Sequence, residues 1–152
     1  MSTPLVIRPA QAQDWDQWLP LWRGYNACRA DASTVPDEVT RLTWQRFFDA
    51  CEPLHALVAQ QGGRLVGLTH YLFHRSTTKL GPNCCLQDLF TVAAVRGQGV
   101  GRALIEAASE RAKAGGASSV DWQTHETNTT AMQLYDRVAA KSGFIVYRRD
   151  PA

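Results

Sequence analysis

One short glycine-rich segment constrains the fold of this chain more than any other feature. Gly97, Gly99 and Gly101 alternate between an apolar run and a long helical pattern. Glycine lets backbone N–H groups approach an anion closely, and a helix N-terminus adds unpaired donors and the positive end of its dipole. The segment lacks the GK[ST] ending of a Walker P-loop and the spacing of GxGxxG, so nucleotide hydrolysis and dinucleotide binding fit poorly. A phosphate-bearing ligand is the natural occupant, and a tight turn without a ligand is the alternative for the glycines alone.

The patterns around these glycines predict alternating strands and helices. Strands are expected over residues 5–10, 54–60, 64–75, 84–92, 118–124 and 144–147. Helices are expected from Asp14, from Pro36 to about Ala50, from Gly99 to Gly115, and over 128–139. Gln61-Gly62-Gly63 has hairpin chemistry, so the strands on either side of it are expected to pair antiparallel. This order favours a mixed α/β sheet with helices on both faces.

The size and charge of the chain narrow its class. Its 152 residues are the size of one ordinary domain, so we expect a single domain over residues 1–152. The net charge is only +2 and the basic residues are dispersed, which argues against nucleic acid as a partner. We also expect no membrane span and a cytoplasmic location, because no run approaches about 18 apolar residues and residues 1–6 lack a secretion-signal pattern.

The cysteines and histidines lack the spacing of a metal site. His70 and His74 are four residues apart in a strand pattern, where they would lie about 13 Å from each other. We therefore expect no metal. The cysteines lack CxxC spacing and are interpreted as buried thiols, not as disulfides or metal ligands: Cys28, Cys51, Cys84 and Cys85.

The glycine segment closely resembles a known family signature. RxxGxG after an apolar strand, followed by Ala103-Leu104, resembles the pyrophosphate-binding motif of the GNAT superfamily of N-acetyltransferases. The resemblance covers the whole chain in order of elements, with its specific motifs between Leu86 and Tyr147. It implies a central mixed, mostly antiparallel sheet with splayed central strands, helices on both faces, and acetyl-CoA as co-substrate. The cofactor-binding residues that it implies are Phe90, Thr91, Val92, Arg96, Gly97, Gln98, Gly99, Val100, Gly101, Arg102 and Asn128.

A second motif supplies a candidate acid. Asn128 to Tyr135 resembles the family's helix Asn-x-x-Ala-x-x-Leu-Tyr. By that resemblance Asn128 would contact the pantetheine arm, which the backbone of residues 90–92 would hold like an added strand. Tyr135 would lie beside the CoA sulfur and donate a proton to the departing thiolate. A lone tyrosine on an amphipathic helix is otherwise core filler.

The general base is the second catalytic group that the sequence must supply. Leu86-Gln87-Asp88-Leu89-Phe90 resembles a segment of the branch that contains diamine (spermidine/spermine) acetyltransferases and yeast histone and polyamine acetyltransferase homologues. Gln87 occupies the position of that branch's glutamate base, and an amide cannot take up a proton. Asp88 is the nearest carboxylate, and strand alternation predicts that only one of the two residues faces the cofactor. Asp88 is either catalytic, with a water chain or Glu126 carrying the proton away, or an ordinary hydrogen-bonded carboxylate.

The expected function is transfer of an acetyl group to a primary amine by direct attack in a ternary complex. The acceptor is a small amine, polyamine or amino-acid-like, or a protein lysine. Two alternatives stay open: a ping-pong route through Cys84 or Cys85, and a non-catalytic CoA-binding sensor or structural module. A homodimer is expected by resemblance, with residues 144–147 near its interface. Aromatic residues that line an acceptor pocket or pack in the core are Trp22, Tyr25, Trp44 and Trp122.

Overall fold

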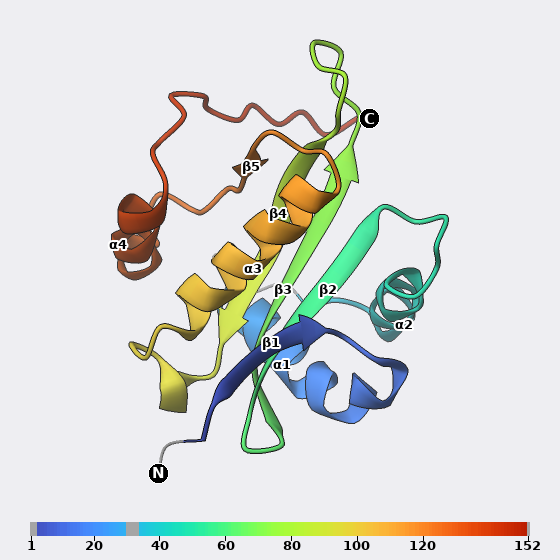
Figure 1. Cartoon of the computed structure of the whole chain (residues 1–152), viewed down its shortest axis with the longest axis vertical. Coiled ribbons are helices and arrows are strands. Elements are labelled where there is room, and N and C mark those ends of the chain that lie inside the picture. The colour runs from blue at the N-terminus through green and yellow to red at the C-terminus, as the bar shows by residue number, and fades with distance from the viewer. Residues whose placement is uncertain (1–2, 30–33, 152) are drawn as a thin grey trace.

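The computed structural model of the chain describes residues 3–29 and 34–151. Over these residues it has one mixed sheet with the strand order β1-β2-β3-β4-β5, and helices lie on both faces (Figure 1). β1 to β4 are antiparallel neighbours, whereas β5 runs parallel to β4. The strands are β1 (Leu5–Pro9), β2 (Leu54–Gln61), β3 (Arg64–His74), β4 (Asn83–Thr91) and β5 (Val120–Asp121), and the helices are α1 (Trp15–Ala27), α2 (Asp37–Arg46), α3 (Val100–Ala114) and α4 (Thr129–Val138).

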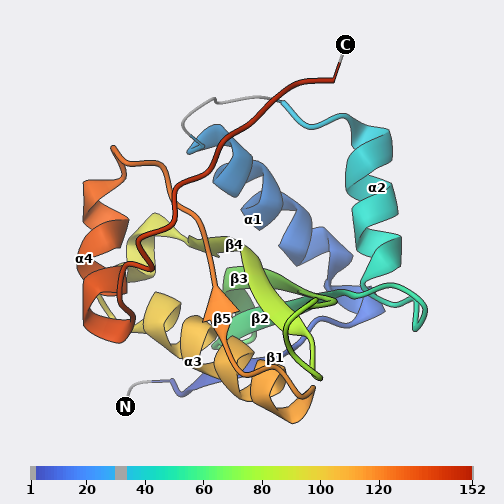
Figure 2. The same cartoon turned by 90° about the horizontal axis from the view of Figure 1, so that it is seen from above.

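The sheet separates two hydrophobic cores. Figure 2 shows α1 and α2 over one face and α3 over the other. The core under α3 is mainly aliphatic, because the three- and four-residue spacing of α3 turns Val100, Leu104 and Ala108 toward the sheet. The core under α1 and α2 is aromatic, and Trp18, which is fully buried, lies at its centre. The fold that the sequence predicted is confirmed.

Three of the predicted elements differ in extent. α2 ends at Arg46 instead of about Ala50, because the chain turns there through bonds such as Asp49 N–H to the Arg46 carbonyl, three residues back. β5 has two residues and not the seven of 118–124. The predicted strand over 144–147 is wrong, since that segment is extended without a neighbouring strand and its side chains are exposed. A strand needs a partner for its N–H and C=O groups, and β5 is too short to supply one.

The cysteines divide into two kinds. Cys84 is buried and Cys85 half-buried in β4, as predicted. Cys28 and Cys51 are exposed, so the prediction of a buried thiol is wrong for both. The reason is their position, because one follows the end of α1 and the other lies in the turn between α2 and β2.

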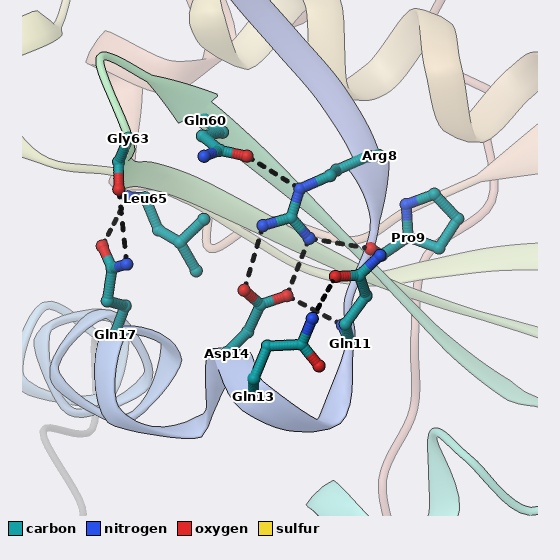
Figure 3. A network of polar contacts seen from close by, with 9 residues as sticks. All are labelled: Arg8, Pro9, Gln11, Gln13, Asp14, Gln17, Gln60, Gly63 and Leu65. Atoms are coloured by element: carbon teal, nitrogen blue, oxygen red, sulfur yellow. Dashed lines mark hydrogen bonds and ion pairs between the residues drawn. The ribbon is translucent and has the colours of Figure 1, made fainter.

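An ion pair ties the first strand to the first helix (Figure 3). The Arg8 guanidinium donates two hydrogen bonds to the Asp14 carboxylate, at 2.7 and 2.9 Å, and its Nε donates to Gln60 at 2.8 Å. These bonds from Arg8 hold the pKa of Asp14 below its usual range. Because Arg8 lies in β1 and Asp14 directly precedes α1, the pair fixes the angle at which α1 leaves the sheet. Among the described residues, no helix has both the length and the apolar character to cross a membrane.

Candidate active site

The sheet opens between β4 and β5. The two strands pair only through Cys84 with Val120 and Cys85 with Asp121, and the chain after Asp121 leaves the sheet. In the described chain no strand borders β4 on this side from Leu86 to Thr91. This opening is the splay of central strands that the sequence predicted, and it leaves a length of β4 backbone that a ligand can approach.

The glycine loop lies at the end of this opening. Gly97 and Gly99 have φ angles of 78° and 84°, in the left-handed region that favours glycine. A Cβ atom on either would meet nothing within 4 Å, so the backbone here is open to a ligand. Ala103 N–H donates to the Gly99 carbonyl at 3.0 Å as the first bond of α3. The N–H groups of residues 100–102 therefore have no partner in the helix, and this loop and helix start fit an anion.

Close packing joins the loop to β4 and α4. A Cβ atom on Gly101 would lie 3.3 Å from Leu134 Cδ2 in α4 and 3.8 Å from Thr91 Oγ1 at the end of β4. The start of α3, the end of β4 and the face of α4 thus meet at Gly101. The fold brings the predicted cofactor-binding segments, 90–92 and 96–102, next to one another.

Two backbone groups of the predicted pantetheine strand already have partners within the protein. Val92 N–H donates to the Val66 carbonyl at 2.9 Å, and the Thr91 carbonyl accepts from Arg96 Nε at 3.0 Å. The Arg96 guanidinium also lies over the Phe90 ring, 5.7 Å from its centroid. Arg96 therefore braces the loop against β4.

The other predicted cofactor contacts lie at the surface. Arg102 forms an exposed ion pair with Glu106, 2.9 Å between Nε and Oε1. Asn128 directly precedes the first residue of α4, and its Nδ2 donates to Thr124 Oγ1 at 3.1 Å. Gln98 is exposed within the glycine loop. All three side chains are accessible to a ligand at this end of the sheet.

Tyr135, the predicted acid, lies in α4 against Trp122, just after β5. Its ring is half-buried and lies edge-on to Trp122, with centroids 5.5 Å apart. Burial raises the pKa of the phenol, which therefore keeps its proton at neutral pH. A protonated phenol beside the strand opening fits the role of a proton donor.

Asp88 lies on the opposite face of the sheet from α3. It is 9% exposed and pairs across β3 with His70, whose Nδ1 lies 2.9 Å from Asp88 Oδ2. The other ring nitrogen of His70, Nε2, accepts a hydrogen bond from Trp18 Nε1 at 3.0 Å. No local motif links Asp88 to His70 or His70 to Trp18, so neither hydrogen bond could be predicted from the sequence.

The regular alternation assumed for Gln87 and Asp88 is interrupted in β4. The pairing passes from His70 with Asp88 to Tyr71 with Leu86, so Gln87 is the extra residue of a β-bulge. A bulge interrupts the alternation of side chains, which therefore does not exclude either residue from the acceptor side. Gln87 itself is exposed.

Tyr25 of α1 approaches the same carboxylate. Burial, the charge of Asp88 and a hydrogen bond to Asp88 together raise the pKa of the Tyr25 hydroxyl. Tyr135 contributes to the same rise in pKa.

The remaining candidates from the sequence are two cysteines, two tryptophans and a glutamate. Burial raises the pKa of Cys84 to about 11, and that of Cys85 is also raised, so neither thiol is an activated nucleophile. Trp22 and Trp44, at 8% and 9% exposed, pack in the aromatic core, which is the second of the two roles left open for them. Glu126 is exposed in the segment before α4.

Comparison with known proteins gives a consistent result. The family model described as "Acetyltransferase (GNAT) family" matches residues 15–140. The chain is 31% identical to the D-amino-acid N-acetyltransferase of Saccharomyces cerevisiae over 148 residues, which are 96% of this chain and 91% of that protein. It is 35% identical to the thialysine N-epsilon-acetyltransferase of Bos taurus over 95 residues, 57% of this chain and 55% of that protein. An aminoglycoside N-acetyltransferase solved in complex with CoA superposes with a TM-score of 0.85 at 16% identity, over 100% of this chain and 98% of that one.

Proposed function

The chain belongs to the GNAT acetyltransferase family and is an N-acetyltransferase, and from this premise we propose that it transfers the acetyl group of acetyl-CoA to a primary amine by direct attack in a ternary complex. The relatives from yeast and cattle confirm the branch that the Leu86–Phe90 segment resembles. The observation that carries the proposal is the convergence of the open glycine loop, the strand opening and Tyr135 at one end of β4.

Several features support acetyl-CoA as the co-substrate. The pyrophosphate would take the N–H groups at the start of α3, where Gly97 and Gly99 leave the backbone open. The pantetheine arm would follow β4 where β5 has diverged, and Asn128 would reach it from α4. The solved aminoglycoside N-acetyltransferase with bound CoA shares this fold.

Tyr135 and Asp88 are proposed as the catalytic pair. The amine nitrogen attacks the thioester carbon, the C–S bond breaks, and Tyr135 gives its proton to the leaving sulfur. An alkyl ammonium must first lose a proton, because its pKa of about 10.4 keeps it charged at pH 7. Asp88 is the buried carboxylate on the acceptor side of the sheet and is proposed to receive that proton.

The acceptor is proposed to be a small amino-acid-like amine. The relatives are named for D-amino acids and for thialysine, both of which carry an amine and a carboxylate on a compact skeleton. The side of the sheet that Asp88 faces is aromatic, since His70 bonds to the carboxylate and the Trp22 ring contacts both His70 and Tyr25. A polyamine and a protein lysine are the competing acceptors.

A thiol-release assay with acetyl-CoA tests the function. We expect faster turnover with D- or L-amino acids or thialysine than with spermidine, an aminoglycoside or a lysine peptide. Saturating kinetics with intersecting double-reciprocal lines would support the ternary complex, and parallel lines would indicate a ping-pong route. CoA binding without turnover on any amine would instead favour the non-catalytic module.

We also propose that the chain forms a homodimer through residues 144–147. These four consecutive apolar residues are between 66% and 90% exposed. A hollow of about 470 Å³ beside β5 is lined by apolar side chains that include Ile105, Val120 and Trp122. Residues 144–147 of a second copy would cover the exposed residues 144–147 and the hollow of the first copy. The single domain over 1–152 and the cytoplasmic location stay predictions.

A further inference from the structure

A chain of two buried hydrogen bonds fixes the protonation of His70. An indole N–H can only donate, so the Trp18 bond at 3.0 Å requires a lone pair on His70 Nε2. A neutral imidazole then carries its proton on Nδ1, which donates to Asp88 Oδ2 at 2.9 Å. Trp18 is 0% and His70 1% exposed, so water does not compete for either bond. The donor direction therefore runs from Trp18 through His70 to Asp88.

The Trp18 donor leaves no place for a second N–H on His70. An imidazolium has two N–H donors, and the one on Nε2 would oppose the indole N–H. Rings surround His70, with Phe47 at 4.6 Å, Trp22 at 5.3 Å and Trp18 at 5.8 Å between centroids. A charge on the ring would be poorly solvated there. His70 thus acts toward Asp88 as a fixed donor and not as a competing base.

The other groups that act electrostatically near Asp88 come from three elements. Burial and the charge of Asp88 raise the pKa of Tyr25 in α1, whereas the charge of Arg29 after α1 lowers it. Cys85 lies on β4 itself, and burial and the charges of Asp121 and Asp88 raise its pKa. Tyr135 in α4 also raises the pKa of Tyr25.

We propose that Trp18 and His70 are positioning residues that hold Asp88 as an oriented proton acceptor. This proposal rests on the proposed acetyl transfer. An N–H bond of the ammonium breaks and its proton passes to a carboxylate oxygen of Asp88. The products are a neutral amine and a neutral carboxylic acid.

This proton transfer is favoured by its surroundings. It converts a cation and an anion into two neutral groups, which a buried aromatic site solvates at less cost. It also gives the chain a carboxylate base without a glutamate at Gln87, because the next residue is Asp88.

A direct readout of the two hydrogen bonds of His70 is NMR of the histidine ring nitrogens, which does not require activity. In the wild type we expect the ring proton of His70 on Nδ1 and a free lone pair on Nε2. A ring with its proton on Nε2 would overturn the proposal. Trp18→Phe removes the indole donor and should let the proton occupy either ring nitrogen.

Kinetics separate positioning from simple packing. His70→Met removes both hydrogen bonds and should lower kcat about tenfold or more, the scale of a weakened general base, and alter the acidic limb of the pH profile while KM changes little. His70→Gln offers an amide oxygen to Trp18 and an amide N–H to Asp88, so it should recover most of the rate and the profile. A wild-type rate and pH profile in folded His70→Met would overturn the role of His70.

Absence of turnover in the wild type on every amine would refute the proposed function. The tautomer of His70 would still decide whether Trp18 and His70 orient Asp88.

Discussion

Leu86 and Asp88 are two residues apart in β4, yet their side chains lie on opposite faces of the sheet. Leu86 packs in the core under α3, and Asp88 bonds to His70 beside α1. The bulge at Gln87 causes this reversal, because it adds one residue to β4 opposite β3. The bulge thereby turns a carboxylate toward the acceptor side, at the point where β4 and β5 have parted.

Tyr135→Phe tests the proposed acid. Loss of the phenol proton should lower kcat roughly tenfold or more with a small change in KM. Because burial raises the pKa of Tyr135 above its usual value near 10, the wild type should keep the protonated acid through neutral and mildly alkaline pH. Its alkaline loss of activity should therefore begin only above that range. Tyr71→Phe, at a buried site in the core under α3, is the control for the same chemical change.

The Tyr135 prediction would be contradicted by a rate in Tyr135→Phe equal to that of the control. An alkaline limb that remains in the phenylalanine variant would show that another group titrates there.

Gly99→Ala tests the anion site. Gly99 has a φ of 84° with open space around it, so the substitution adds backbone strain of about 1–2 kcal/mol and no clash. We expect weaker CoA binding by calorimetry, because relaxation of this strain would shift the N–H groups of the loop. Gly63→Ala is the matched control, since its φ of 75° and open surroundings are similar, in the hairpin between β2 and β3. Equal CoA affinity in the two variants would argue against the site.

The sequence predicted what depends on neighbours along the chain. α3 and the glycine loop follow from local spacing, and so does the antiparallel hairpin of β2 and β3. The contact between Trp18 and His70 joins positions 52 residues apart, and no local pattern announces it. The bulge at Gln87 was equally hidden, because it depends on the register between two strands. The strand predicted over 144–147 failed for the same reason, since its apolar residues have no neighbouring strand.

Phe144→Ser with Val146→Ser tests the homodimer. Both side chains are exposed, at 90% and 66%, so their replacement costs a single chain little and removes apolar area from the proposed interface. We expect light scattering after gel filtration to give two chains for the wild type and one for the variant. Leu80→Ser, also at a fully exposed apolar position, should leave the mass unchanged. A wild-type mass of one chain would refute the dimer.

Asp14→Asn tests the link between β1 and α1, and its effect should depend on pH. The bonds from Arg8 hold the pKa of Asp14 below the unfolded value near 3.9, so the carboxylate stabilises the fold above that value. This contribution is lost as pH falls through the folded pKa. At pH 7 we expect the variant to lower the free energy of unfolding by about 1.5–3 kcal/mol, the range for hydrogen bonds to charged groups. Denaturant unfolding at pH 7 and at pH 2.5 should show that this difference in the free energy of unfolding shrinks in acid. The control is Asp16→Asn, at an exposed site in the first turn of α1, which should change the stability little at either pH. A difference of the same size at both pH values would mean that packing, and not the ion pair, accounts for the effect of Asp14.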